Sequence, residues 1–69
     1  MARKAFKTNG YTLYITTSIG GMIKTQLVDK ITREEVELRY YTSLCEELED
    51  YITSVGVRVN KVSDYLNAI

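Results

Sequence analysis

The chain has 69 residues with nine Lys or Arg, nine Asp or Glu and one Cys, and it contains no His, Pro or Trp. This length sets a limit of one domain, and a core this small rarely supplies more than about 3–5 kcal/mol of stability. One Cys excludes an intramolecular disulfide. The lack of His excludes a Cys/His zinc site and the usual general base near neutral pH. We therefore expect a protein that is not an enzyme and that uses neither a cofactor nor a metal.

The hydropathy of the chain bears on its location. Residues 1–7 are basic, but no apolar run follows them that would complete a signal peptide. No segment approaches the roughly 18 apolar residues that a membrane-spanning helix needs. We expect a cytoplasmic protein, in the host cytoplasm if its source is a virus, with no membrane partner.

Charge is balanced over the whole chain but segregated along it. Residues 1–30 hold five cations against one acid (+4), residues 31–56 hold two against seven (−5), and residues 57–69 hold two against one (+1). Such segregation produces either two faces of opposite sign or elements that neutralise each other when packed. We expect residues 1–10 to form a flexible basic arm and residues 11–69 a single domain.

The first half of the chain has the pattern of a β-hairpin. Tyr11–Ser18 alternates, with Leu13 and Ile15 on one side, which is the period of a half-buried strand. Gly20-Gly21 follows and tolerates the positive φ that a hairpin turn requires. Met22–Val28 is the expected return strand.

The segment Ile31–Tyr41 decides the topology, because it fits either a strand or a helix. As a strand, it points Val36, Leu38 and Tyr40 inward and Glu35, Glu37, Arg39 and Tyr41 outward. As a helix, it would begin with a capping box of Thr32 and Glu35. The helix, however, leaves Leu38 off the apolar stripe and places Thr42-Ser43 mid-helix, where neither is favoured. We predict the strand.

Two helices are expected after this strand. Ser43 and Glu46 form a capping box for a helix over residues 43–55, whose acidic first turns suit the helix dipole and which Gly56 ends. Asn60 is the expected N-cap of a short last helix. The apolar face of that helix consists of Val62, Tyr65, Leu66 and Ile69.

Together these elements predict an α+β fold. We expect a three-stranded antiparallel meander with one amphipathic helix packed on one face and a short C-terminal helix, because a meander needs only short turns. The predicted core consists of Leu13, Ile15, Ile23, Leu27, Val36, Leu38, Tyr40, Leu44, Leu48, Ile52, Val55 and Leu66.

Two groups of residues are candidates for binding a partner. The first is the acidic helix surface of Glu46, Glu49 and Asp50, whose carboxylates, about 6 Å apart along the helix, can imitate successive phosphates. The alternative is a solvated helix face. The second group is Tyr14, Arg39 and Tyr41 on the sheet face away from the helix, where tyrosines offer contact area at low entropic cost. Its alternative is ordinary cross-strand pairing.

A third group of residues suits nucleic acid. Arg3, Lys4, Lys7, Lys24 and Lys30 are able to contact phosphates. Asn9-Gly10-Tyr11 and the strand that follows resemble the amino-terminal arm-binding domains of phage-type integrases. Those modules are strongly basic, whereas this chain has no net charge, which gives weak electrostatic attraction to DNA. Nucleic acid is therefore the less favoured partner.

The order of the elements also resembles a class of small phage-encoded inhibitors. The hairpin (Tyr11–Val28), the third strand (Val36–Tyr41) and the acidic helix (Ser43–Val55) follow the order found in some anti-CRISPR proteins, which bind and block bacterial defence complexes. The resemblance implies a stoichiometric inhibitor or accessory factor that occupies a surface of a larger protein or nucleoprotein complex. Exposed strand edges and a small core additionally favour a homodimer.

Overall fold

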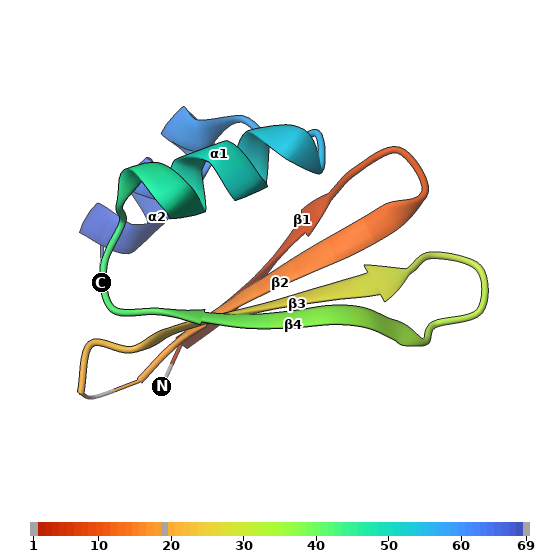
Figure 1. Ribbon diagram of the computed structural model, residues 1–69, viewed down its shortest axis with the longest axis horizontal. Helices are drawn as coiled ribbons and strands as arrows, with labels where there is room; N and C mark the ends of the chain where they lie inside the picture. Colours follow the sequence, from red (N-terminus) through yellow and green to blue (C-terminus); the bar gives the residue numbers. More distant parts are fainter. Residues whose placement is uncertain (1, 19, 69) are drawn as a thin grey trace.

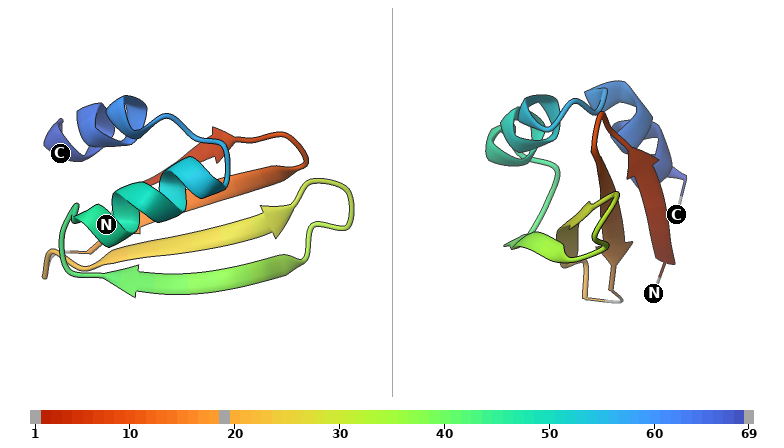
Figure 2. Two further views of the ribbon diagram at one scale, coloured as in Figure 1. Left: turned by 45° about the horizontal axis from the view of Figure 1, so that its top comes forward. Right: turned by 90° about the vertical axis from the view of Figure 1, so that its right-hand side faces the viewer.

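The computed structural model describes residues 2–18 and 20–68, and in them it has four strands followed by two helices (Figure 1). The sheet is an antiparallel meander in which each strand pairs with the next. Both helices lie on one face of this sheet (Figure 2). The elements are β1 (Ala2–Lys7), β2 (Tyr11–Thr17), β3 (Ile23–Asp29), β4 (Glu35–Tyr41), α1 (Glu46–Ser54) and α2 (Val59–Asn67).

The α+β meander is confirmed, but its strand count is four where we predicted three. The segment expected to be a flexible arm forms β1, which pairs with β2 along its whole length. Phe6 is the reason, because it lies opposite Leu13 and is buried edge-on against Tyr65 of α2, with ring centroids 6.1 Å apart. The basic residues on either side of Phe6 concealed the strand pattern.

The turn between β3 and β4 is held by one side chain. The Asp29 carboxylate accepts hydrogen bonds from the backbone N–H groups of Ile31 and Thr32, at 2.8 and 2.9 Å. These two bonds favour the charged carboxylate and lower the pKa of Asp29 below its usual value. Arg33 then adopts a positive φ of 64°, which closes the turn and starts β4.

A β-bulge at Val36 sets the orientation of β4. Val28 pairs with Glu35 and Leu27 pairs with Glu37, so Val36 is one residue more than β3 matches. An inserted residue turns every later side chain to the opposite face of the sheet. Val36, Leu38 and Tyr40 are therefore exposed, which corrects the prediction that they belong to the core.

The core lies between the sheet and the two helices. Six of the predicted core residues are buried: Leu13, Ile15, Ile23, Leu27, Leu48 and Ile52. Leu44, Val55 and Leu66 pack against this core while half-buried. The residues that the prediction omitted are Phe6, Tyr51, Val57 and Val62.

Both helices begin at other residues than we predicted. The N-cap of α1 is Cys45, and no side chain caps the helix, so the predicted capping box of Ser43 and Glu46 is wrong. Ser43 lies two residues before that N-cap and is out of reach of the first turn. The N-cap of α2 is Arg58, which places Asn60 inside the helix. Gly56 has the expected positive φ of 90° after α1, and Ile69 lies outside the described residues.

We predict that Phe6→Ala destabilises the protein by about 3 kcal/mol or more, the usual cost of removing a buried aromatic side chain. Urea denaturation followed by circular dichroism measures this loss. Val36→Ala is the matched control, because Val36 is exposed and its truncation is expected to change the free energy of unfolding by about 0.5 kcal/mol or less. Equal stability of Phe6→Ala and the wild type would contradict the assignment of β1 to the folded domain.

Candidate functional site

The face of the sheet opposite the helices carries an exposed apolar strip. On β4 the side chains of Val36, Leu38 and Tyr40 are 56%, 42% and 59% exposed, although all three are apolar or aromatic. Val28 lies opposite Glu35 at the bulge, and Gln26 lies opposite Leu38. Figure 2 shows both helices on the other side of the sheet. We call this uncovered surface the open face.

Tyr14 lies on the open face, as predicted from its alternation with Leu13 and Ile15. The Arg3 guanidinium stacks on its ring, 3.9 Å from the centroid. Tyr14 lies opposite Gln26 on β3, and Gln26 in turn lies opposite Leu38 on β4. One row of the open face therefore joins a cation-stacked aromatic ring to the exposed apolar strip.

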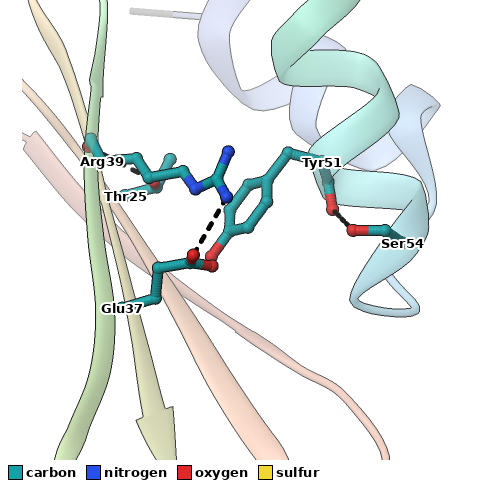
Figure 3. Close-up of polar contacts among 5 residues, drawn as sticks. All are labelled: Thr25, Glu37, Arg39, Tyr51 and Ser54. Atoms are coloured by element: carbon teal, nitrogen blue, oxygen red, sulfur yellow. Dashed lines mark hydrogen bonds and ion pairs between the residues drawn. The ribbon is translucent and has the colours of Figure 1, made fainter.

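Arg39 and Tyr41 were predicted on the open face, and this prediction is wrong. The bulge turns both toward the helices, where they lie against Tyr51 of α1. Figure 3 shows Arg39 beside the Tyr51 ring. The Arg39 guanidinium is 4.6 Å from the centroid of the Tyr51 ring, and the Tyr41 ring centroid is 6.4 Å from it. Arg39 Nη2 also donates a hydrogen bond of 2.9 Å to Glu37 Oε2. We call Glu37, Arg39, Tyr41 and Tyr51 the rim cluster.

Charges in the rim cluster shift the pKa values of its members. The hydrogen bond from Arg39 lowers the pKa of Glu37, and the same pairing raises the pKa of Arg39. The Tyr51 hydroxyl is buried without a hydrogen bond of standard geometry, although it points toward the Glu37 carboxylate (Figure 3). Burial, assisted by that carboxylate, raises the pKa of Tyr51 to about 12.

The three acidic residues predicted on α1 do not act as one group. Glu46 and Asp50 are exposed, and Glu49 is half-buried. Of these three, Asp50 alone lines a shallow hollow beside β4, together with Glu47 and the strand residues Arg39, Tyr40 and Tyr41. The structure therefore brings Asp50, Arg39 and Tyr41 to one edge of the molecule and leaves Tyr14 on the open face. Sequence reasoning missed Glu47, because nothing in the pattern distinguishes it from its acidic neighbours.

The predicted basic group is divided among three places. Lys4 and Lys7 border a groove between β1 and α2, where Arg58 and Lys61 join them. Among the described residues that line this groove, Asp64 is the one acid. Arg3 and Lys24 lie on the open face, because they pair with Thr16 and Tyr40. Lys30 lies in the turn after β3. Arg58 and Lys61 were missed because they are distant from the basic N-terminal segment in sequence.

The remaining features are the single cysteine, possible metal ligands and possible membrane-spanning helices. Cys45 is half-buried against the core. Among residues 2–18 and 20–68, no group of three His, Cys, Asp or Glu side chains is placed to hold a metal ion. In the same part of the chain, no helix is both long and apolar enough to cross a membrane. Comparison of the chain with protein-family models, curated proteins and solved structures finds no match.

We predict that Tyr51 makes the stability of the protein fall at high pH. Its pKa is about 12 in the folded chain and near 10 when unfolded, so the folded state holds the proton more tightly. The resulting stabilisation is complete below pH 10 and is lost as the pH rises through 12. Urea denaturation at pH 10 and at pH 12 measures the free energy of unfolding at both ends of this window. Between these two values, the free energy of unfolding should fall more for the wild type than for Tyr51→Phe. Equal losses in the two proteins would contradict the raised pKa.

Proposed function

We propose that the protein is a non-enzymatic interaction protein that occupies a surface of a larger protein or nucleoprotein complex through its open face. The observation that carries the proposal is the exposure of Val36, Leu38 and Tyr40 on a sheet face that neither helix covers. Exposed apolar strips bordered by polar residues are typical of protein-binding surfaces. A small inhibitor or accessory factor acting in the cytoplasm is the form of this function that we propose.

The surroundings of the apolar strip fit this role. Tyr14 and Tyr40 supply aromatic contact area, and tyrosine is one of the residue types enriched where interfaces derive most of their energy. Arg3 already stacks on Tyr14, so that ring is held in place before a partner arrives. Thr12, Thr16, Lys24 and Gln26 place polar groups around these rings. An apolar centre with a polar border is the usual composition of a protein interface.

The acidic surface of α1 has a secondary part in this proposal. Asp50 lies near β4, whereas Glu46 does not line the hollow there. Both side chains are exposed. They contribute charge to the rim of the molecule, where electrostatics steer association more than they determine affinity.

Affinity capture from the lysate of the natural host tests the proposal. The double variant Leu38→Thr/Tyr40→Thr replaces apolar groups on the open face and keeps residues that favour strands. We expect a partner retained by the wild type to be lost from this variant, because the apolar contact area is removed. Mass spectrometry of the two captured samples measures the difference.

The matched control is Glu46→Lys/Asp50→Lys, which reverses two charges on α1 and leaves the open face unchanged. It should retain the same partner. A partner that binds the open-face variant normally but is lost from the α1 variant would place the binding surface on the helix. Turnover of any substrate by the purified protein would contradict a purely binding role.

Nucleic-acid binding is a second candidate, favoured by the groove between β1 and α2. Four cations border it, namely Lys4, Lys7, Arg58 and Lys61, against the single acid Asp64. Local positive charge of this kind attracts phosphates even where the whole chain is neutral. The groove lies at the opposite edge of the sheet from β4, so this function does not require the open face.

Duplex DNA binding measured over a salt series tests the second candidate. Lys7→Gln/Lys61→Gln should weaken binding and reduce the slope of log affinity against log salt by roughly 2, since each lost phosphate contact removes about 0.9. Lys30→Gln is the control, because Lys30 does not line the groove. Failure of the wild type to bind at low salt would eliminate this candidate.

A further inference from the structure

The outer edge of β4 is unpaired in the described chain. β4 is the last strand of the sheet, and its only neighbour is β3. This edge has the length of an ordinary strand, Glu35–Tyr41, and alternate residues along it present backbone donors and acceptors outward. Such an edge is a template for another strand unless Pro, Lys, a β-bulge or a cover protects it. The bulge of β4 lies near its start, at Val36, and leaves Glu37–Tyr41 in regular register with β3. This edge contains neither Pro nor Lys.

The sequence of β4 is complementary to itself when read in the opposite direction. A two-fold axis that pairs a strand with its own copy is perpendicular to the sheet, so residues of the same face lie opposite each other. Centred on Leu38, this pairing sets the residues of Val36–Tyr40 opposite partners of the same face, whereas Glu35, which precedes the bulge, and Tyr41 lie on different faces. It sets Glu37 of one protomer opposite Arg39 of its partner, twice, and sets Val36 opposite Tyr40, twice. Opposite charges and aromatic–β-branched pairs are the cross-strand combinations that stabilise a sheet.

The neighbouring registers are unfavourable. Centred on Glu37, the pairing would set Glu37 opposite itself, and centred on Arg39 it would set Arg39 opposite itself. Like charges directly opposite destabilise a strand pair. The Glu37 and Arg39 side chains are 39% and 50% exposed and pair with each other at 2.9 Å, so pairing across the edge would exchange the ion pair within each chain for two between the protomers. Charge therefore selects the register centred on Leu38.

The other edge of the sheet lacks this property. β1 carries Arg3, Lys4 and Lys7 and no acid. Pairing of β1 with its copy would set Lys4 opposite itself in the register centred on Lys4. In the register centred on Ala5 it would set Arg3 opposite Lys7. A strand of one charge sign is a protected edge, so the second copy is expected at β4.

A second complementarity lies beyond the paired residues. In the register centred on Leu38, the turn of the partner that holds Lys30 and Arg33 continues past Tyr41, toward the start of α1. Glu47 and Asp50 border the hollow beside β4 at this end of the strand. Two cations of the partner thus approach two exposed acids, and the two-fold axis repeats the arrangement.

We infer that the protein forms a two-fold dimer in which β4 pairs antiparallel with β4 of a second copy, centred on Leu38. This inference extends the proposed function without depending on it, because the dimer joins two open faces into one. Six apolar side chains, Val36, Leu38 and Tyr40 from each protomer, then form one continuous strip across the middle of the joined sheet. The strip that binds the larger partner is doubled.

Charge exchange between Glu37 and Arg39 tests the register. Analytical ultracentrifugation should find a dimer for the wild type. Glu37→Arg or Arg39→Glu alone should raise the dissociation constant of the dimer about tenfold or more. Each of these variants sets two pairs of like charges opposite each other across the β4–β4 edge. An equimolar mixture of the two single variants should form a heterodimer with wild-type affinity. In that heterodimer every Arg at positions 37 and 39 lies opposite a Glu of the other chain. Recovery of the wild-type affinity would therefore also show that both variants fold.

Cysteine cross-linking tests the axis. In a Cys45→Ser background, Leu38→Cys places two thiols opposite each other, with Cα atoms about 4.5–5.5 Å apart, within disulfide range. Mild oxidation should produce a covalent dimer. Val36→Cys is the control, because its two copies lie about 14 Å apart along the strands and should not cross-link.

Three outcomes would overturn the inference. These are a monomer at submillimolar concentration, no recovery when the single variants are mixed, and a growing series of larger species, which would indicate head-to-tail pairing of β1 with β4. A monomer that still captures a larger partner through its open face would leave the proposed function intact. A dimer that captures nothing would retain the inference and remove the proposed function.

Discussion

The β-bulge at Val36 determines which side chains of β4 reach the helices and which reach solvent. Continued from the Val28–Glu35 pair without the extra residue, the strand would set Val36, Leu38 and Tyr40 opposite Leu27, Thr25 and Ile23 on the core face. The bulge places Glu37, Arg39 and Tyr41 there instead. Since side chains alternate between the faces with period two, one residue is enough to reverse the whole strand. The rim cluster and the open face are both results of this reversal.

The reversal has an energetic cost that complex formation would offset. Each of the three apolar side chains is about half exposed and so forgoes part of the roughly 1.5–3 kcal/mol that full burial would contribute. The helix side recovers part of this loss. Arg39 stacks on Tyr51, and the buried Thr25 hydroxyl donates to the Arg39 carbonyl at 3.3 Å. Burial of Leu38 and Tyr40 against a partner would recover the remainder, which is why we place the binding surface on the open face.

The sequence predicted the elements better than their orientation. Alternation in β2 and β3 and the apolar stripe of α1 follow from local periodicity, and six buried residues of these elements were correctly identified, although Tyr51 of α1 was omitted. The face of the sheet on which each side chain of β4 lies depends on the bulge. The alternation of residues 35–41 does not reveal this bulge. Arg39 and Tyr41 were therefore assigned to the wrong face, whereas Tyr14 was not. The groove cations Arg58 and Lys61 join Lys4 and Lys7 only through tertiary packing, and no sequence spacing relates them.

The two edges of the sheet differ in a way that limits assembly. β4 carries both signs of charge in a self-complementary order, and β1 carries cations alone. Pairing through β4 therefore closes after two copies and leaves both β1 strands outermost. Because the cations of β1 and α2 border the groove at that edge, the joined sheet has a basic groove at each end and an apolar strip at its centre. On the open face itself, Lys24 and Arg3 of each protomer lie beyond the strip. A partner contacting the strip would therefore meet positive charge on both sides, which favours a surface with an apolar centre and acidic surroundings.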